Sequence, residues 1–127
     1  MDSVLLVDDE EDICDFLSII LQNLELDVKY AFSGEDALAL IEKHKFVIAV
    51  VDLKLSTSVT GLNVIKAIRD KSPQTLVAAM SGYVDVGLAQ ETRHLGVCDY
   101  LEKPRDIQPD VFLKKIQMLL LKSGSRK

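Results

Sequence analysis

The segment from Phe46 to Asp52, FVIAVVD, restricts the possible folds of this chain more than any other stretch. Six apolar residues in a row, several of them β-branched, are typical of a strand buried on both faces at the centre of a parallel sheet. The segment ends on a carboxylate. In open α/β folds, ligands bind at the edge formed by the carboxyl ends of the strands. The sequence therefore predicts that Asp52 lies at a functional edge of a parallel sheet.

Other short apolar runs predict four more strands, at residues 4–7, 28–32, 76–80 and 97–101. Apolar residues at three- and four-residue steps predict helices between and after these runs. Ser33 is expected to cap the second helix, Gly96 to end the fourth in a left-handed conformation, and Pro109 to begin the last. The first helix is expected to pack an inner face made of Ile13, Phe16, Leu17, Ile20, Leu21 and Leu24.

This alternation defines the expected fold class. Five strands and five helices in turn predict an α/β fold with right-handed crossovers. We expect a doubly wound five-stranded parallel sheet in the flavodoxin-like order 2-1-3-4-5, flanked by five helices. At 127 residues the chain is expected to be one domain over residues 1–122, with residues 123–127 as a disordered tail.

Composition excludes several classes of partner. The net charge is -5 and the pI is about 4.9, and no stripe of Lys and Arg is present, so direct binding to nucleic acid is not expected. No apolar run approaches the roughly 20 residues that a membrane-spanning helix needs. Met1 is followed at once by the first strand, which leaves no room for a signal peptide.

The two cysteines indicate a reducing compartment. Cys14 and Cys98 stand in apolar surroundings without the spacing of a metal site or a disulfide framework, so both are expected to be small core residues. Together with the missing signal peptide, this predicts a cytoplasmic location.

Polar residues gather at the ends of four predicted strands, which deliver Asp8 and Asp9, Asp52, Ser81 and Lys103. Three neighbouring carboxylates repel one another, by about 4 kcal/mol for a pair 4 Å apart at an effective dielectric constant of 20. A hard cation such as Mg²⁺ (or Mn²⁺) would compensate. Lys103 and the Ser81 hydroxyl could then bind an anionic group beside the metal. This combination indicates phosphoryl transfer to Asp52.

Each residue alone has a simpler interpretation. An acidic block after a strand is ordinarily a solvated loop, and Asp52 alone could cap a helix. The hypothesis of phosphoryl transfer depends on all of these residues occurring together at the ends of four strands.

Four motifs together resemble the receiver domain of two-component response regulators, the CheY-like family, over essentially the whole chain. They are LLVDDE at residues 5–10, VVDLKL at 50–55, MSGY at 80–83 and LGVCDYLEKP at 95–104. Each motif is weak alone, but jointly they are highly specific.

The resemblance implies a role for each matching residue. Asp52 would be the phosphoacceptor and Lys103 the phosphoryl-binding lysine. Ser81 would be the switch hydroxyl and Tyr100 the switch aromatic. The implied Mg²⁺ ligands are Asp9, Asp52, Asp8 acting through water, and the backbone carbonyl of Lys54.

The function implied is a phosphorylatable signalling switch rather than an enzyme, apart from its own phosphorylation and dephosphorylation. A sensor histidine kinase or histidine phosphotransfer protein would phosphorylate Asp52. The surface of the fourth helix, fifth strand and fifth helix would then change and act on a downstream effector domain or protein. A weak homodimer through this surface is also allowed.

Two alternatives remain open. A Mg²⁺-dependent phosphatase with an aspartate nucleophile generally needs a second acid two residues later, where this chain has Lys54. A pseudo-receiver that binds partners without phosphorylation is disfavoured because every acceptor residue is retained.

One region departs from the family pattern. Ser56 stands where the family usually has a proline, and the usual glycine arrives one residue late, at Gly61. The loop from Ser56 to Thr60 is therefore expected to be longer and looser. Tyr83 is expected to be a loop residue whose aromatic ring lies near the entrance to the pocket.

Overall fold

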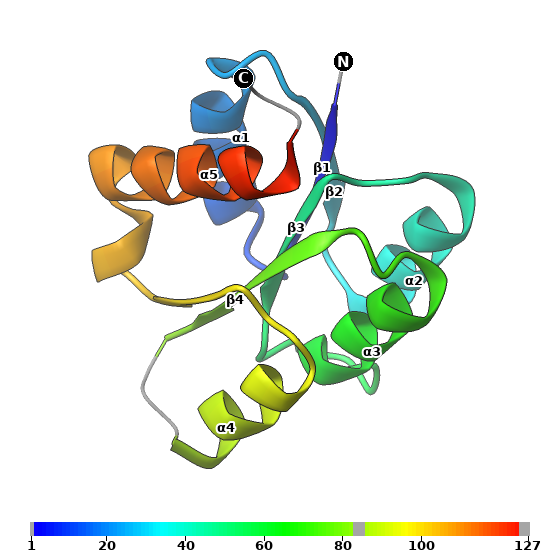
Figure 1. Ribbon diagram of the computed structural model, residues 1–127. Coiled ribbons are helices and arrows are strands. Elements are labelled where there is room, and N and C mark those ends of the chain that lie inside the picture. The colour runs from blue at the N-terminus through cyan, green and yellow to red at the C-terminus, as the bar shows by residue number, and fades with distance from the viewer. Residues whose placement is uncertain (1, 83–85, 125–127) are drawn as a thin grey trace.

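A single parallel sheet forms the centre of the computed structural model, which describes residues 2–82 and 86–124 (Figure 1). The strand order is β2-β1-β3-β4-β5, as the sequence predicts. The strands are β1 (Ser3–Val7), β2 (Asp27–Ala31), β3 (Ile48–Asp52), β4 (Leu76–Ser81) and β5 (Asp99–Glu102). Every residue of β3 is buried, which confirms its expected place at the centre of the sheet.

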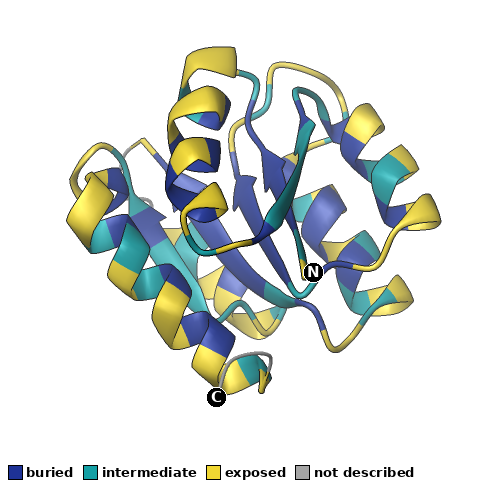
Figure 2. Cartoon of the chain, turned by 90° about the horizontal axis from the view of Figure 1, so that it is seen from above, coloured by how far each residue is buried: buried dark blue, intermediate teal, exposed yellow. Residues whose placement is uncertain are grey.

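Helices cover both faces of this sheet (Figure 2). They are α1 (Glu11–Gln22), α2 (Gly34–Lys43), α3 (Gly61–Lys71), α4 (Val86–His94) and α5 (Pro109–Ser123), with a short 3-10 helix, η1 (Arg105–Ile107), before α5. One core cluster joins the sheet to α1 and α5, and a second joins it to α2 and α3, with α4 packed beside that cluster. The predicted fold class is therefore confirmed.

The predicted helix ends have clear local causes. The Ser33 hydroxyl accepts a hydrogen bond from the Asp36 backbone N–H, as an N-cap should. Gly96 has a φ of 78°, the left-handed conformation that favours glycine. Pro109 stands at the start of α5, where its missing N–H costs nothing.

The prediction for the inner face of α1 is wrong at Phe16, whose side chain is 42% exposed. The buried stripe passes through Cys14, Leu17 and Leu21. Phe16 comes two residues after Cys14, which is about 200° further round a helix, so it faces outward. The inner position is taken instead by Ser18, whose hydroxyl lies 2.5 Å from that of Tyr30.

The loop between β3 and α3 packs against the start of α2. A Cβ atom added to Gly34 would lie 2.3 Å from the Val59 carbonyl oxygen, so only glycine allows this approach. Hydrogen bonding to Thr57 lowers the pKa of the Glu35 carboxyl, with a smaller effect from Ser58. The loop that was expected to be loose thus has specific contacts with α2.

Gly61 allows a second close approach. A Cβ atom there would lie 2.3 Å from the Asp52 carbonyl oxygen and 2.6 Å from the Leu53 Cα. Thr60 and Asn63 form a reciprocal capping box that fixes the start of α3 at this point. The glycine that arrives one residue late therefore lets α3 begin directly against the end of β3.

The expected boundary between domain and tail at residue 122 stays a prediction. Helix α5 continues to Ser123, and Gly124 follows it with a φ of 76°. The last three residues of the expected tail, and Tyr83, lie outside the described residues.

Candidate functional site

Three side chains from distant parts of the chain meet at the carboxyl edge of the sheet. Asp8 follows β1, Asp52 ends β3, and Lys103 follows β5. The Lys103 ammonium Nζ donates to Oδ2 of Asp8 and to Oδ2 of Asp52, each at 3.0 Å. One cation thus bridges the carboxylates of two neighbouring strands, β1 and β3, although Lys103 itself follows β5, which β4 separates from β3.

Backbone groups fix the remaining oxygens of the two carboxylates. The Lys54 N–H donates to Oδ1 of Asp52 at 3.1 Å, and the Glu10 N–H donates to Oδ1 of Asp8 at 2.9 Å. Both acids are almost fully buried as residues, with 1% of Asp8 and 3% of Asp52 exposed. The two side chains are therefore held in defined orientations.

Burial and neighbouring charges shift the pKa values of Asp52 and Lys103. Burial, followed by the negative charge of Asp8, raises the pKa of Asp52 to about 6, although Lys103 opposes the shift. Burial also disfavours the charged form of Lys103, but the charges and hydrogen bonds of Asp52 and Asp8 outweigh it and raise the Lys103 pKa. The Lys103 ammonium beside Asp52 favours its ionised form, the form in which a carboxylate can react as a nucleophile.

Asp9 completes a group of three carboxylates. One oxygen from each of Asp8, Asp9 and Asp52 can be chosen such that all three lie within 4.8 Å of one another. Oxygen donors at this separation suit Mg²⁺, which binds through one or two carboxylates and keeps several waters. The donor set present therefore fits the metal expected from the sequence.

A groove of about 350 Å³ opens over the group. Asp9, Asp52 and Lys103 line it, as does Lys54, whose carbonyl was predicted to be a metal ligand. The groove gives the Asp52 carboxylate access to a reactant from solvent.

The two predicted switch residues lie on β4 and β5. Ser81 ends β4 and is buried, and its carbonyl oxygen accepts from the Lys103 N–H at 2.8 Å. Tyr100 is half-buried against the core on the α2 and α3 side. Its hydroxyl oxygen is buried and has no hydrogen-bond partner among the residues that the structure describes. The ring is therefore turned inward in this structure.

Sequence reasoning missed two acidic residues near the site. The Glu10 carboxylate lies 3.8 Å from Lys103 Nζ. Glu10 belongs to the acidic block, so its position after β1 was a signal that could have found it.

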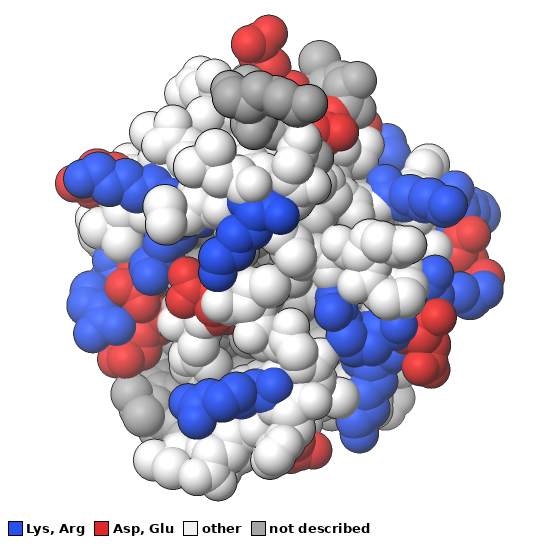
Figure 3. Space-filling view, viewed as in Figure 1, with Lys and Arg blue, Asp and Glu red and all other residues white. Residues whose placement is uncertain are grey.

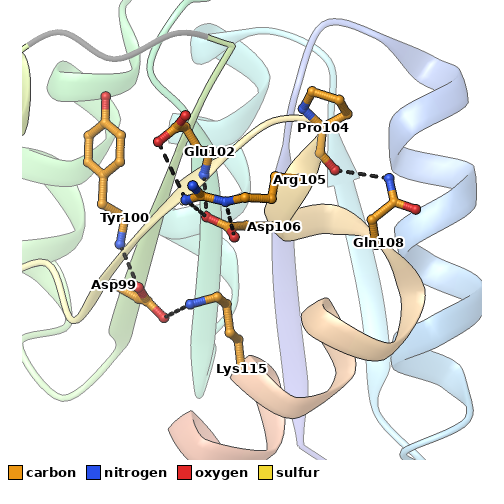
Figure 4. A network of polar contacts seen from close by, with 8 residues as sticks. All are labelled: Asp99, Tyr100, Glu102, Pro104, Arg105, Asp106, Gln108 and Lys115. Atoms are coloured by element: carbon orange, nitrogen blue, oxygen red, sulfur yellow. Dashed lines mark hydrogen bonds and ion pairs between the residues drawn. The ribbon is translucent and has the colours of Figure 1, made fainter.

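The second missed residue is Asp106, which belongs to the polar network in Figure 4. Its Oδ2 accepts from the Glu102 N–H at 2.9 Å, and both of its oxygens accept from the Arg105 guanidinium at 3.0 Å. The hydrogen bond from Arg105 is the main reason that the Asp106 pKa falls to about 2. Asp106 thus closes the turn that contains Lys103, a role that no sequence pattern indicated.

Of the two cysteines, Cys14 is buried and Cys98 half-buried, and both are free thiols. Burial, followed by the charge of Asp8, raises the pKa of the Cys14 thiol to about 12, which makes it unreactive.

The surface agrees with the acidic composition. On the face seen in Figure 3, Lys and Arg side chains are scattered and several lie beside Asp or Glu, without one continuous basic stripe. Within residues 2–82 and 86–124, no helix has the length and apolar character needed to cross a bilayer.

Comparison with known proteins identifies the family. The model of the response regulator receiver domain matches residues 4–117. The chain is 33% identical over 103 residues to the response regulator protein PilR of Pseudomonas aeruginosa, an alignment that covers 81% of this chain and 23% of PilR. The chain spans roughly a quarter to somewhat over half the length of the curated relatives that it matches.

Solved structures agree with this assignment. A CheY-like receiver domain protein from Methanospirillum hungatei has a TM-score of 0.91 and 25% identity, with 100% of this chain and 99% of that chain covered. A Burkholderia pseudomallei response regulator solved with a phosphorylated aspartic acid and a calcium ion has a TM-score of 0.82 and 27% identity, covering 94% and 66%. The chain belongs to the response regulator receiver domain family of two-component systems, whose members act as signalling switches.

Proposed function

We propose that the chain is a phosphorylatable switch in which Asp52 accepts a phosphoryl group. One observation carries this proposal: the Asp52 carboxylate lies 3.0 Å from Lys103 Nζ, beside two further carboxylates and beneath an open groove. The Burkholderia pseudomallei relative with a phosphorylated aspartic acid supports the chemistry.

In the proposed step, an oxygen of ionised Asp52 attacks the phosphorus atom of the donor. A carboxylate–phosphorus bond forms while the bond between phosphorus and the donor nitrogen or oxygen breaks, and its electron pair leaves with the donor. A phosphohistidine donor leaves as an imidazolate, which takes up one proton to become imidazole, and an acyl phosphate leaves as a carboxylate. The Lys103 ammonium turns from Asp52 to the phosphoryl oxygens and offsets their charge.

The carboxylates of Asp8, Asp9 and Asp52 would form the metal site. Asp9 and Asp52 would bind Mg²⁺ directly, with Asp8 acting through water and the Lys54 carbonyl completing the protein ligands. The bound ion would supply positive charge to the phosphoryl oxygens.

The signal is proposed to pass through Ser81 and Tyr100. A phosphoryl group on Asp52 offers acceptor oxygens to the Ser81 hydroxyl, because β3 and β4 are neighbours and Asp52 pairs with Met80 in the sheet. Movement of Ser81 would change the packing of Tyr100 on β5. The surface formed by α4, β5 and α5 would then shift toward the state that the phosphoryl group binds better.

The partners follow from this chemistry. We propose a sensor histidine kinase or a histidine phosphotransfer protein as donor and an effector domain or protein as target. The free thiols of Cys14 and Cys98 favour action in the reducing cytoplasm.

Phosphorylation by a small acyl phosphate tests the proposal. The chain is incubated with acetyl phosphate, with and without Mg²⁺, and its intact mass is measured. We expect one phosphoryl adduct in the presence of Mg²⁺, sensitive to hydroxylamine, and no adduct on Asp52→Asn. Asp70→Asn, an exposed carboxylate on α3, is the matched control and should be modified like wild type. Equal modification of Asp52→Asn and wild type would place the acceptor elsewhere.

The switch has a separate test. Ser81→Ala should still accept the phosphoryl group, but the NMR signals of the Tyr100 ring should no longer shift on phosphorylation. An equal shift in wild type and variant would show that Ser81 does not transmit the signal.

A further inference from the structure

We propose that Asp99 and Asp106 close the open edge of strand β5, so that this edge cannot pair with β5 of a second copy of the chain. Strand β5 is the last in the order of the sheet. One of its sides pairs with β4, and in the described part of the chain no strand pairs with the other side. The free N–H and C=O groups of an edge strand can bind a strand of another molecule. Closure of this edge is independent of phosphorylation of Asp52.

The backbone of β5 turns two N–H groups away from β4. The N–H of Lys103, directly after β5, donates to the Ser81 carbonyl oxygen on β4 at 2.8 Å. Successive N–H groups of a strand point to opposite sides, so the Glu102 N–H points to the open side. The Tyr100 N–H, two residues earlier, points the same way. A strand added to this edge would have to bind these two N–H groups.

A side-chain carboxylate already accepts from each of these N–H groups (Figure 4). Oδ1 of Asp99 accepts from the Tyr100 N–H at 2.8 Å. Oδ2 of Asp106 accepts from the Glu102 N–H at 2.9 Å. A partner strand would need to place its carbonyl oxygens where these carboxylate oxygens lie. It would therefore have to displace both carboxylates before it could pair.

A basic side chain holds each carboxylate in its position. Lys115 on α5 donates from Nζ to Oδ2 of Asp99 at 3.4 Å. The Arg105 guanidinium donates to both oxygens of Asp106 at 3.0 Å. Hydrogen bonds between charged groups are stronger than those between neutral groups. Displacement of Asp99 and Asp106 by a partner strand would break these contacts as well.

A second copy of β5 is the strand that this closure excludes. A two-fold axis would place the β5 edges of two copies side by side and antiparallel, which is the simplest way to join two identical edges. The segment VCDYL at residues 97–101 includes Val and Tyr, which favour strands. The surface of α4, β5 and α5 can therefore associate through its side chains, but not by continuing the sheet from one copy into the next.

Removal of both carboxylates tests the proposal. In a variant that combines Asp99→Ala with Asp106→Ala, the Tyr100 and Glu102 N–H groups lose their acceptors. Analytical ultracentrifugation over a range of concentrations should then show a shift towards dimers or larger species relative to wild type. Infrared spectroscopy should show the amide I band of a sheet that joins molecules, because the new contacts are backbone hydrogen bonds.

A conservative variant separates the hydrogen-bond acceptors from their charges. Asp99→Asn combined with Asp106→Asn keeps a side-chain oxygen beside each N–H, so this variant should behave as wild type in both measurements. Asp70→Ala combined with Asp110→Ala removes two exposed carboxylates elsewhere and is the matched control for charge. Gly61→Ala is the control for lost stability, because it leaves both carboxylates of the edge in place.

Circular dichroism shows whether each variant is folded. If the double alanine variant unfolds, Asp99→Ala alone decides, because 31% of the Asp99 side chain is exposed and its loss opens one N–H group of the edge. A folded variant of this kind that associates no more than wild type would overturn the proposal. Association of the asparagine variant or of Gly61→Ala to the same extent as the alanine variant would overturn it too.

Discussion

Lys103 balances two buried carboxylates, so its removal leaves Asp8 and Asp52 facing each other without a counter-ion. We expect Lys103→Met to lower the free energy of unfolding by about 3 kcal/mol at pH 7 in the absence of divalent ions. Urea denaturation measures the loss. The added change Asp52→Asn should restore part of it by removing one charge.

The control for this substitution is Lys71→Met. Lys71 pairs with Glu42 at 2.7 Å, but both side chains are more than half exposed. An exposed pair contributes less than about 1 kcal/mol. Equal losses in the two variants would show that burial does not strengthen the Lys103 contacts.

Asp106 gives a pH-dependent contribution. Its folded-state pKa is about 2, below the ordinary 3.8, so its contribution is complete above pH 3.8 and is lost as the pH falls through 2. The difference in unfolding free energy between wild type and Asp106→Asn should therefore shrink between pH 4 and pH 2. Urea denaturation at a series of pH values measures it, with Asp70→Asn as the control for loss of one exposed charge. A difference that stays constant would contradict the shift.

For single residues, the sequence predicted which side chains meet at the site, but not the hydrogen bonds that join them. The ends of parallel strands share one edge, so Asp8, Asp52 and Lys103 could be brought together from strand positions alone. The bridge from Lys103 to both acids depends on the turn that Asp106 closes. That turn is held by the hydrogen bond from the Lys103 N–H to the Ser81 carbonyl and by the one from the Glu102 N–H to Asp106, and the second of these has no periodic signal.

At the scale of elements, α3 approaches the end of β3 closely beside the site. In Gly61→Ala, the new methyl group would meet the Asp52 carbonyl oxygen, a backbone atom that cannot turn aside. We expect a loss of about 1–3 kcal/mol in stability, the usual effect of overpacking. Gly82→Ala is the control, because a Cβ atom there meets no atom of the described residues within 4 Å. Chemical denaturation compares the stabilities of the two variants. Equal stabilities would show that α3 can shift to make room for the added methyl group without a loss of stability.

The elements were largely predictable because buried strands and amphipathic helices have different periods. Phe16 was misplaced because three- and four-residue steps allow two neighbouring stripes on one helix, and packing selects between them. The contacts of Val59 and Thr57 with α2 could not be predicted, because they join segments that share no pattern. Greater mobility of the loop stays a prediction, now best placed at Ser56, which is exposed.

For the whole molecule, a bound metal should add to stability. An ion that binds only the folded state stabilises it by about 1.4 kcal/mol at ten times its Kd. We expect the melting temperature of wild type, but not of Asp9→Asn, to rise with Mg²⁺ concentration. Glu11→Gln, which removes a nearby exposed carboxylate, should behave as wild type. A similar rise in Asp9→Asn would remove Asp9 from the ligand set.

The bridge from Lys103 to Asp8 also connects the exposed edge of the sheet to its interior. Strand β5 has four residues and is paired on one side, so it is the natural place for the sheet to open locally. Any opening that detaches β5 together with Lys103 must separate an ammonium from two carboxylates. Backbone amide hydrogen exchange in β5 should therefore be slowed by this ionic contact. Lys103→Met should speed exchange at Leu101 and Glu102 more than at Val28 and Lys29 on β2, the opposite edge strand. The exchange rate of β5 amides would then measure how well the charges of the site are balanced.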